Sequence, residues 1–485
     1  MRIYGINDSS HDAALSIVED GEIVFAAHSE RYNKQKNTFY LDRSLLDEAL
    51  QFGPPDIISY FEKRNLKWLR RMMWGGINGD YSFLYKKMHK HVLNARETQV
   101  KHHRSHAAAG YFTSCFEDAT IVVLDAIGEI ETASIWDASG PYITQRESFK
   151  YPFSFGLFYS AFTNLVGLKA GTEEYILMGM AAYGDKRRFF NDVESYFPRW
   201  DLQTASFHTG VPDWPHPIET EQDKFDIAAA AQFVYTLRLI EFMQHARRDS
   251  KSTNLVFMGG CALNCLANTK LLSIWEEVWI MPNPGDAGSS LGAALSIYGH
   301  HVEWQGPYLG HDIGGPWPVQ EVYESLILDG LTAVASGRAE FGPRSLGNRS
   351  LLADPSSIHI KERVNDIKHR EQFRPFAPVV MEDHVHDWFD IDRPSPYMQY
   401  AVKCLQPDRV PGIVHRDGTS RVQTVNELQH PDLYQLLKKW HEETGIPMLL
   451  NTSLNIKGQP IINDSKDAEE WQRRYGREVH TIGAT

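Results

Sequence analysis

Residues 226–260 read DIAAAAQFVYTLRLIEFMQHARRDSKSTNLVFMGG, and this stretch decides the fold class. Its first part, Asp226–Arg248, has the composition and apolar periodicity of one long helix. The next part, NLVFM, is a short apolar run of the kind found in buried strands, and it leads into the pair Gly259-Gly260. A helix followed by a strand and a glycine-rich strand end predicts a mixed α/β protein with a ligand crevice at that end of the sheet.

Similar patterns precede and follow this stretch. The first thirty residues predict three short antiparallel strands, with Asp20-Gly21 as the turn between the second and the third. Residues 119–125, ATIVVLD, predict a buried strand that carries Asp125 to a sheet edge. From Gly285, the sequence GDAGSSLGAA predicts a helix whose small first residues leave backbone N–H groups open to an anion.

The region from 300 to 318, HHVEWQGPYLGHDIGGPWP, is rich in Gly, Pro and Trp. Such a composition predicts a domain boundary. We therefore expect two α/β domains, residues 1–310 and 311–485.

The composition restricts the class of protein. The chain has 485 residues, a net charge of −13 and 42% hydrophobic residues, which excludes disordered, collagen-like and disulfide-scaffold proteins. No apolar run approaches the roughly 18 residues of a membrane span, and the start lacks a basic and apolar leader. The four cysteines form no CxxC pair, which argues against a zinc ribbon and fits a reducing compartment. We expect a soluble, cytoplasmic protein with no membrane partner.

One segment departs from the overall acidity. Residues 60–104 contain eleven Lys or Arg and three Asp or Glu, with several aromatic residues between them. This mixture suits phosphate neutralisation combined with base stacking. A pair of amphipathic helices with a solvated basic face is the alternative interpretation.

The sequence HHRSH places His102 and His106 one helical turn apart, about the separation that a single metal ion needs. Two surface or capping histidines would give the same spacing. Asp125 and Asp286 at predicted strand or loop ends favour a site of two histidines and two carboxylates, suited to iron, manganese or zinc. Such an ion can polarise a carbonyl or phosphoryl oxygen.

A second cluster lies in the C-terminal domain. Cationic side chains there alternate with Phe and Pro residues that would partly bury them, and buried cations need anionic partners. Together with hydroxyl and amide groups they suit a small anion that carries phosphate and carbonyl groups. A solvated basic face is the alternative. The residues are Arg344, Arg349, Lys368, Arg370, Arg374 and Arg421, followed by Asn451-Thr452-Ser453-Leu454-Asn455.

Motifs along almost the whole chain resemble the ATP-dependent O-carbamoyltransferases, the family of the nodulation-factor, cephamycin, novobiocin and tobramycin carbamoylating enzymes. The similar stretches include GINDSSHDAALSIVEDGEIVFAAHSER, KHHRSHAAAGYF, NLVFMGGCALNCLAN, NPGDAGSSLGAAL, AEFGPRSLGNRSLLADP and LLNTSLNIKGQPI. The resemblance implies an N-terminal domain with an actin-like, sugar-kinase-like fold, similar to the tRNA threonylcarbamoyl-transfer ATPase. It implies a C-terminal domain similar to threonylcarbamoyl-adenylate synthase.

The resemblance also implies roles for individual residues. In the first domain it implies His11 at the transfer centre and Lys36 as an acceptor contact. It implies metal ligands at His102, His106, Asp125 and Asp286, and nucleotide contacts at Asp125, Ala126, Ile127, Gly128, Gly259, Gly260 and Asn264. In the second domain it implies that carbamoyl phosphate and the adenylate are bound by Arg344, Lys368, Arg370, Arg374, Arg421, Ser453 and Asn455.

The reaction implied is transfer of the carbamoyl group of carbamoyl phosphate, through an ATP-derived carbamoyl-adenylate, to an acceptor hydroxyl. The expected cofactors are ATP with Mg²⁺, carbamoyl phosphate as donor, and a divalent metal, with Fe²⁺ ahead of Mn²⁺ or Zn²⁺. The oligomeric state stays open.

The basic segment favours a 5-hydroxymethylpyrimidine, such as 5-hydroxymethylcytosine, in DNA or in a nucleotide as acceptor. Such a base must be flipped out or single-stranded to react. A sugar or natural-product hydroxyl is the alternative. Two other classes are a tRNA-modifying or hydrogenase-maturation carbamoyl enzyme, and a non-catalytic actin-like nucleotide switch.

Overall fold

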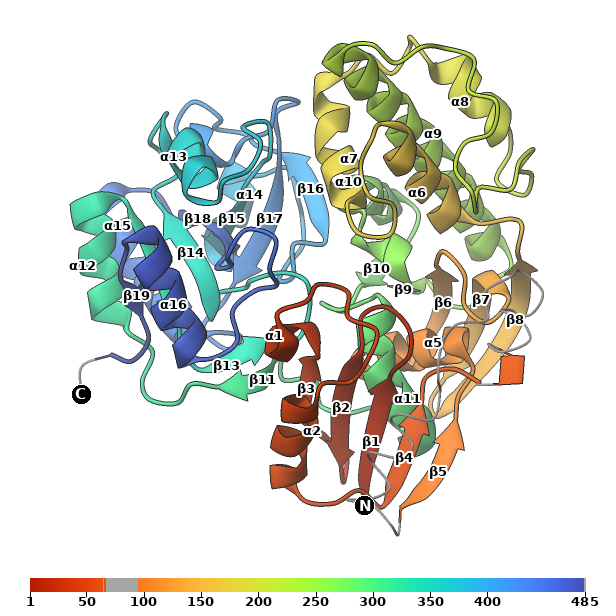
Figure 1. Ribbon diagram of the computed structural model, residues 1–485, viewed down its shortest axis with the longest axis horizontal. Helices are drawn as coiled ribbons and strands as arrows, with labels where there is room; N and C mark the ends of the chain where they lie inside the picture. The colour runs from red at the N-terminus through yellow and green to blue at the C-terminus, as the bar shows by residue number, and fades with distance from the viewer. Residues whose placement is uncertain (64, 67–94, 484–485) are drawn as a thin grey trace. The chain divides into compact units, whose positions relative to one another are not determined.

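The computed structural model describes residues 1–63, 65–66 and 95–483 (Figure 1). By its internal contacts the chain divides into two compact units. The first comprises Met1–Asn33 and Asn37–Trp304, and the second comprises Lys34–Lys36 and Gln305–Thr485. Both units contain β-sheets covered by helices, so the protein has a mixed α/β fold.

The first unit begins with the antiparallel strands that the sequence predicts. The turn at Asp20 and Gly21 has a positive φ at both residues, 50° and 95°, which suits the right-handed twist of a tight hairpin. The complete sheet has the order β3-β2-β1-β4-β5, and β4 and β5 run parallel to β1. Its strands are β1 (Arg2–Asn7), β2 (Ala14–Glu19), β3 (Glu22–His28), β4 (Ile57–Tyr60) and β5 (Arg96–Gln99).

The second sheet of this unit repeats the same topology. Its order is β8-β7-β6-β9-β10, the first three strands are antiparallel, and β9 and β10 run parallel to β6. The first unit is therefore built from two halves of equivalent connectivity. The strands are β6 (Asp118–Leu124), β7 (Glu131–Ser139), β8 (Tyr142–Lys150), β9 (Asn254–Met258) and β10 (Glu277–Trp279).

Equivalent helices of the two halves pack against each other. Helix α5 (His102–Thr113) follows β5, and α11 (Ser289–Tyr298) follows β10. Helix α11 contacts α5 and β1, while α5 contacts β6 and β9, so the helix pair lies between the sheets (Figure 1). The approach is close enough to require glycine, since a Cβ on Gly292 would lie 1.7 Å from the backbone oxygen of Ser105. This contact fixes the starts of both helices relative to each other.

The remaining helices of the first unit lie in the segments of the chain that connect successive strands. Helix α9, which the sequence predicts, begins with a capping box in which Thr220 and Asp223 bond each other's backbone N–H groups. The bounds are α1 (Glu30–Asn33), α2 (Arg43–Ala49), α6 (Phe155–Leu165), α7 (Glu174–Met180), α8 (Phe190–Tyr196), α9 (Glu221–Arg248) and α10 (Cys265–Asn268).

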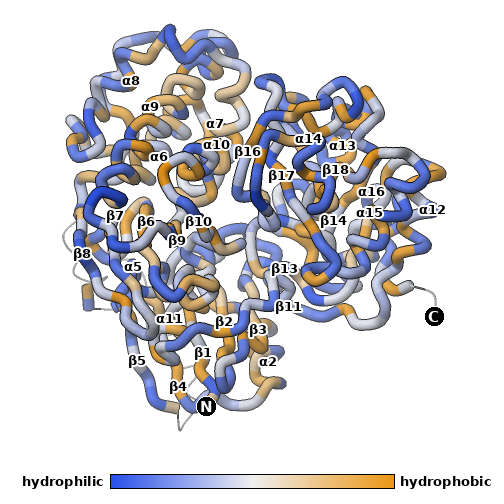
Figure 2. Tube along the Cα trace, turned by 180° about the vertical axis from the view of Figure 1, so that it is seen from behind, coloured by the Kyte–Doolittle hydropathy of each residue, from blue (hydrophilic) through white to orange (hydrophobic). Residues whose placement is uncertain are grey.

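The second unit has a mostly antiparallel seven-stranded sheet of order β16-β17-β15-β18-β14-β12-β19. Helices α12 (Val319–Asp329) and α15 (Pro431–Thr444) pack together on it, and their buried residues form the core with buried Val, Leu and Met residues of the strands. Apolar segments of the chain are coloured orange in Figure 2. The strands are β12 (Leu331–Ala335), β14 (Arg349–Ala353), β15 (Ala377–Met381), β16 (Tyr400–Lys403), β17 (Thr419–Val425), β18 (Met448–Ser453) and β19 (Val479–His480). Outside this sheet lie β11 (Tyr308–Asp312), β13 (Arg338–Glu340), α13 (Ile360–Ile367), α14 (Val385–Trp388) and α16 (Ser465–Tyr475).

Most of the basic segment 60–104 lies outside the described residues, so the interpretation of its aromatic and cationic side chains stays a prediction. None of the helices in the described ranges is long and apolar enough to cross a lipid bilayer.

Candidate functional site

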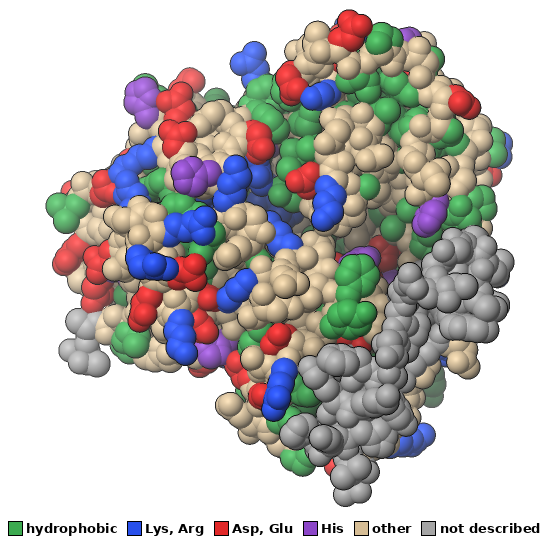
Figure 3. All heavy atoms as spheres, in the orientation of Figure 1, with side chains coloured by type: hydrophobic (Ala, Val, Ile, Leu, Met, Phe, Trp, Pro, Cys, Tyr) green, Lys and Arg blue, Asp and Glu red, His purple; other side chains and the backbone are tan. Residues whose placement is uncertain are grey.

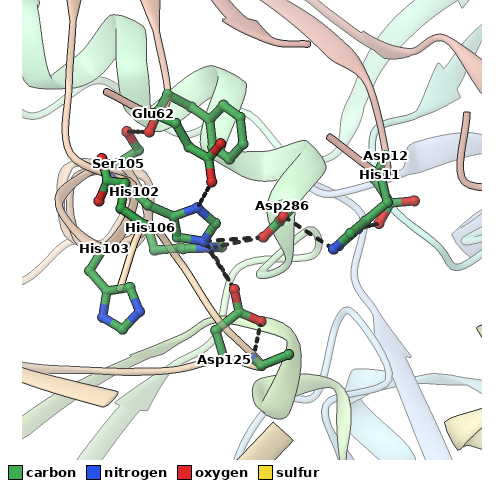
Figure 4. Close-up of polar contacts among 12 residues, drawn as sticks. His11, Asp12, Glu62, His102, His103, Ser105, His106, Asp125 and Asp286 are labelled. Atoms are coloured by element: carbon green, nitrogen blue, oxygen red, sulfur yellow. Dashed lines mark hydrogen bonds and ion pairs between the residues drawn. The ribbon is translucent and has the colours of Figure 1, made fainter. Parts of the chain in front are cut away.

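Four predicted metal ligands converge in the first unit (Figure 4). His102 and His106 lie in the first turns of α5, Asp125 follows β6, and Asp286 lies just before α11. The two helix starts are equivalent positions of the two halves, so the duplicated topology brings both to one place. All four side chains are buried.

The spacing of the donor atoms fits a single ion. Nε2 of His102 lies 3.1 Å from Nε2 of His106, 3.0 Å from Asp125 Oδ2 and 3.4 Å from Asp286 Oδ1. Nε2 of His106 lies 3.6 Å from Asp125 Oδ2 and 3.3 Å from Asp286 Oδ1. Ligands about 2.1 Å from a divalent first-row ion are separated by about 3.0 to 3.4 Å along the edges of an octahedron or tetrahedron. Two imidazoles and two carboxylates at these distances can hold iron, manganese or zinc.

The charges of this group stabilise one another. Burial lowers the pKa of His102 and of His106, but the neighbouring carboxylates outweigh it and raise both pKa values. Burial and mutual repulsion raise the pKa of Asp125, yet its contacts with the histidines hold that pKa below its usual value. The pKa of Asp286 is lowered in the same way. Asp125 and Asp286 are therefore a buried pair of carboxylates that requires positive charge beside it, and the two histidines can supply that charge.

The loops around Asp125 contain the predicted nucleotide contacts. Oδ1 of Asp125 accepts a hydrogen bond from the N–H of Ala126 at 2.8 Å. Gly259 has a φ of 91°, and a Cβ there would lie 2.0 Å from the backbone oxygen of Leu124. A Cβ on Gly260 would lie 3.2 Å from Asp125 Oδ1, so the glycine pair passes directly beside the carboxylate.

The other predicted nucleotide contacts differ in whether they lie beside the donor group. Gly128 lies beside His102, since a Cβ at this glycine would be 3.0 Å from the imidazole ring, and Ile127 precedes it in the same turn. Asn264 forms a buried amide pair with Gln232 at 3.0 and 3.2 Å and caps α10 through the N–H of Ala267. The described contacts of Asn264 are thus internal to the protein.

His11, the predicted transfer residue, lies next to the donor group. Its Nδ1 is 2.9 Å from Asp12 Oδ2, and its Nε2 is 3.5 Å from Asp286 Oδ2. The side chain of His11 is about half exposed; desolvation of the ring lowers its pKa, but the charges of Asp286 and Asp12 outweigh this and raise the pKa to about 10. The imidazole can therefore hold a proton beside the carboxylate of Asp286.

Asn7 joins the His11 loop to Asp286, and no sequence motif marks its role. Its buried Nδ2 donates to the backbone oxygens of His11, Asp12 and Asp286 at 3.3, 2.9 and 3.1 Å. One amide group at the end of β1 thus holds the His11 loop and the backbone of Asp286, which lies 279 positions after Asn7.

Replacing Asn7 with alanine is expected to lower the free energy of unfolding by about 2 kcal/mol, because the buried carbonyl oxygens would lose their donor. Denaturant unfolding followed by circular dichroism measures this. The control is Asn254→Ala, which removes a surface bond to the oxygen of Asp118 and should change stability by less than about 1 kcal/mol. Equal effects of the two substitutions would show that Asn7 has no special role.

The second unit contains the predicted anion site. The side chain of Lys368 is buried, and its Nζ donates to the backbone oxygen of Ser453, to Ser453 Oγ at 3.3 Å and to Asn455 Oδ1 at 2.7 Å. Burial, with the charges of Arg370 and Arg374, lowers the pKa of Lys368 well below its usual value. An anion bound here would relieve this repulsion.

Arg370 and Arg374 are partly buried beside Lys368. Nε of Arg370 donates to Asn365 Oδ1 at 2.6 Å, and its guanidinium lies over the ring of Phe376. These contacts hold the guanidinium in a defined orientation. Figure 3 shows further Lys and Arg side chains gathered on one face of this unit.

Lys36, the predicted acceptor contact, belongs by its contacts to the second unit. Its charge is among those that lower the pKa of Lys368. Neighbouring Lys34 forms an ion pair with Asp467 at the start of α16. The segment Lys34–Lys36 therefore contributes positive charge to the surroundings of Lys368.

Arg421 lies at the same end of the sheet as Ser453. Val379 of β15 is opposite Gln423 of the parallel strand β17, so Arg421 is level with the beginning of β15. Strand β18 runs antiparallel to β15 and ends at Ser453, which places both residues at one edge.

The loop that carries Arg344 is held close to this sheet. Glu340 Oε1 accepts from the backbone N–H of Leu346 at 2.8 Å, and Asn451 Nδ2 donates to the backbone oxygen of Ser345 at 3.1 Å. These bonds fix the backbone on which Arg344 stands.

Arg349, which the sequence grouped with the anion-binding cations, has a different place. It is fully buried, and its guanidinium donates to the backbone oxygens of five residues. Five donors in a planar fork match such a set of carbonyls, so Arg349 holds the sheet to its neighbouring loops. Those five residues are His311, Ser336, Gly337, Asn348 and Asn463.

Comparison with known proteins identifies the family. The family model described as the carbamoyltransferase N-terminus matches residues 63–295, and that of the carbamoyltransferase C-terminus matches residues 324–485. An uncharacterized protein of Synechocystis sp. is 30% identical over 573 residues, covering 96% of this chain and 93% of that protein. The chain belongs to the carbamoyltransferase family.

Two further relatives of this family are similar over most of the chain. Nodulation protein NolO of Bradyrhizobium diazoefficiens is 30% identical over 76% of this chain and 75% of its own length. The 3'-hydroxymethylcephem-O-carbamoyltransferase of Streptomyces clavuligerus is 28% identical over 94% of this chain and 93% of its own. The matches support carbamoyl transfer as the activity of this enzyme family and confirm the resemblance that the motifs predict.

Besides Asn7, two glutamates at the site of this carbamoyltransferase family member were not singled out from the sequence. Glu62 Oε1 lies 3.0 Å from His102 Nδ1. Glu129 accepts from the backbone N–H of Lys63 at 2.9 Å and of His102 at 3.2 Å. Glu129 lies just after the Asp125 turn, and this short distance in sequence could have marked it as part of the site. Glu62 lies 40 positions before His102 and belongs to no motif that could have marked it.

Proposed function

We propose that the protein is an O-carbamoyltransferase that forms carbamoyl-adenylate from carbamoyl phosphate and ATP in its second unit and transfers the carbamoyl group to an alcohol in its first unit. The observation that carries the proposal is the convergence of His102, His106, Asp125 and Asp286 on one buried point, in a chain of the carbamoyltransferase family. In domain terms, residues 1–310 would bind metal and nucleotide, and residues 311–485 would form the adenylate.

The duplicated sheets support an actin-like, sugar-kinase-like first domain, because both halves share one strand order and one arrangement of directions. A nucleotide would bind between two such halves, beside their paired helices. For the second domain, the motif resemblance and the cationic sheet edge support a threonylcarbamoyl-adenylate-synthase-like fold.

In the second domain, Lys368 and the arginines would neutralise the phosphates of the donor and of ATP with Mg²⁺. Carbamoyl phosphate, ATP and one water would give carbamoyl-adenylate, pyrophosphate and phosphate. The lowered pKa of Lys368 supports this role, since two anionic substrates would restore its charged form. Ser453 and Asn455 would hold the ammonium group in position through their existing contacts.

In the first domain, an acceptor hydroxyl would attack the carbonyl carbon of the adenylate. A new C–O bond forms, the bond between that carbon and the AMP oxygen breaks, and AMP leaves. The bound cation would polarise a phosphoryl or carbonyl oxygen. Asp125, Ala126 and the glycine pair would bind and orient the nucleotide.

His11 would move the hydroxyl proton. In the arrangement described, Asp286 and Asp12 favour its protonated form, with a pKa of about 10. A cation held by Asp286 would offset its negative charge and would weaken this constraint on His11. His11 would then be able to accept the proton of the attacking alcohol and return it to solvent.

For the acceptor we propose a primary alcohol on a heterocycle, with 5-hydroxymethylcytosine in DNA or a hydroxymethylpyrimidine nucleotide as first choice. The relative that acts on a hydroxymethylcephem has such an alcohol on a ring, which supports this chemistry. The basic segment 60–104 supports a polyanionic carrier. The same relative also favours a second candidate, the hydroxyl of a natural product or sugar.

Mass spectrometry of candidate acceptors tests the proposal. Purified protein with ATP, carbamoyl phosphate, Mg²⁺ and Fe²⁺ should add one carbamoyl group to hydroxymethylcytosine DNA, to its nucleotide or to a small-molecule alcohol, and release AMP and pyrophosphate. Release of ADP without any carbamoylated product would favour a nucleotide switch instead.

DNA binding should fall steeply with salt if the basic segment contacts phosphates. We expect the dissociation constant for hydroxymethylcytosine DNA to rise at least about tenfold between 50 and 200 mM NaCl, measured by fluorescence anisotropy. Changing Lys86, Lys87 and Lys90 to Gln should flatten this dependence, whereas changing Lys438, Lys439 and Lys457 to Gln should not. A salt-independent affinity would contradict phosphate contacts and favour the small-molecule acceptor.

A further inference from the structure

The two ring nitrogens of His102 face different groups (Figure 4). Nε2 points toward the other three donors, within 3.0 to 3.4 Å of His106, Asp125 and Asp286. Nδ1 points the opposite way and lies 3.0 Å from Oε1 of Glu62. The side chain of Glu62 is only 5% exposed and that of His102 only 1%.

The two histidines differ in this respect. Nδ1 of His106 is buried and forms no hydrogen bond with any residue that the structure describes. His102 thus has a carboxylate behind it, while His106 faces the donor group without such a partner. The hydrogen bond to Glu62 therefore distinguishes one of two otherwise similar imidazoles.

The backbone keeps Glu62 and His102 at this distance. Glu129 accepts one hydrogen bond from the N–H of Lys63, directly after Glu62, and another from the N–H of His102. One carboxylate thus fastens both segments. The contact between Glu62 and His102 is therefore held by the backbone around it.

A carboxylate that accepts Nδ1–H has a definite effect on an imidazole. It places the proton on Nδ1, leaves the lone pair of Nε2 free for a cation, fixes the ring orientation and increases the electron density of the ring. Loss of such a partner commonly reduces metal affinity 10- to 100-fold.

We propose that Glu62 is a positioning residue of the metal centre, which sets the tautomer and orientation of His102 for cation binding. The inference rests on the metal centre of the proposed function. It does not depend on the acceptor, on ATP or on carbamoyl phosphate.

Metal binding without substrates tests the proposal. Zn²⁺ and Mn²⁺ titrations of the full-length protein, by calorimetry and by electron paramagnetic resonance, should give a dissociation constant about 10- to 100-fold higher for Glu62→Gln than for wild type. Glu62→Asp should recover part of the loss, since it restores the negative charge on a shorter side chain.

Glu131→Gln is the matched control. Glu131 is also a buried glutamate of this unit, but its carboxylate accepts from Gln145 and Ser148, and no described contact joins it to the donor histidines. Its substitution should leave metal affinity within about threefold of wild type. A similar loss of affinity in both variants would overturn the proposal.

Nitrogen NMR of the Zn²⁺-loaded wild-type protein gives an answer even if the Glu62 variants do not fold. With ¹⁵N-labelled histidine, Nδ1 of His102 should carry an exchange-protected proton while Nε2 is bound to the ion. A Zn²⁺-bound Nδ1 on His102, or wild-type affinity in folded Glu62→Gln, would contradict the role of Glu62. If wild type and His106→Ala bind equally little metal, the metal centre itself is wrong, and this proposal fails with it.

Discussion

His106→Ala is expected to reduce carbamoyl transfer by about 10³-fold or more, because it removes one of the four converging donors that we propose hold a metal ion. The remaining His102, Asp125 and Asp286 would hold a cation less firmly. The loss should appear in the formation of carbamoylated acceptor, measured by mass spectrometry at saturating substrate. Adenylate formation in the second unit should continue, measured as pyrophosphate release.

His103→Gln is the control for this substitution. His103 lies on the same helix and is also buried, but its Nδ1 contacts Ser134 Oγ at 2.7 Å, and its ring points away from the donor group (Figure 4). We expect it to retain transfer within about threefold of wild type, after correction for the folded fraction. Full transfer activity in His106→Ala, at trace metal concentrations, would exclude the metal centre.

Lys368→Gln is expected to reduce the formation of carbamoyl-adenylate by about 10²- to 10³-fold. The substitution removes the buried cation at the centre of the positive cluster, where the phosphates of both substrates would bind. The measurement is release of AMP and pyrophosphate from ATP and carbamoyl phosphate. Transfer from synthetic carbamoyl-adenylate should be unaffected, because the substitution leaves the four donors of the first unit unchanged.

Lys439→Gln is the matched surface control, since Lys439 also lies in the second unit and its Nζ bonds the side chain of Gln320. It should leave adenylate formation unchanged.

The pH dependence of carbamoyl phosphate binding also tests the role of Lys368. Because the pKa of Lys368 is lowered without substrate, anion binding should take up a proton, and carbamoyl phosphate affinity should therefore fall as pH rises. An affinity that rises with pH would contradict this role.

The grouping of His102, His106, Asp125 and Asp286 could be anticipated from sequence because their signals are local, and their role as metal ligands stays a prediction. His102 and His106 are one helical turn apart, and Asp125 directly follows a short apolar run that is typical of a buried strand. Asn7 and Glu62 could not be predicted in this way. They are ordinary residue types whose roles depend on partners 279 and 40 positions away.

The duplication of the first unit was also hidden from the sequence. Strand order and direction repeat between the two sheets. The apolar pattern of the sequence predicts where strands lie, but it does not predict which strands pair. Arg349 illustrates a related limit. Its sequence context resembles that of Arg344, and only the surrounding backbone oxygens reveal that its charge is used inside the sheet.

The two hydrogen bonds of Glu129 have a consequence for the length of the chain between Lys63 and His102. It fastens the chain at Lys63 and again at His102, and β5 is paired in the sheet just before the second point. Doubling the length of a chain between two such anchors costs only about 0.6 kcal/mol. Because Glu129 joins Lys63 to His102 directly, a change in the length of the chain between these two residues is expected to cost little at the contact of Glu62 with His102.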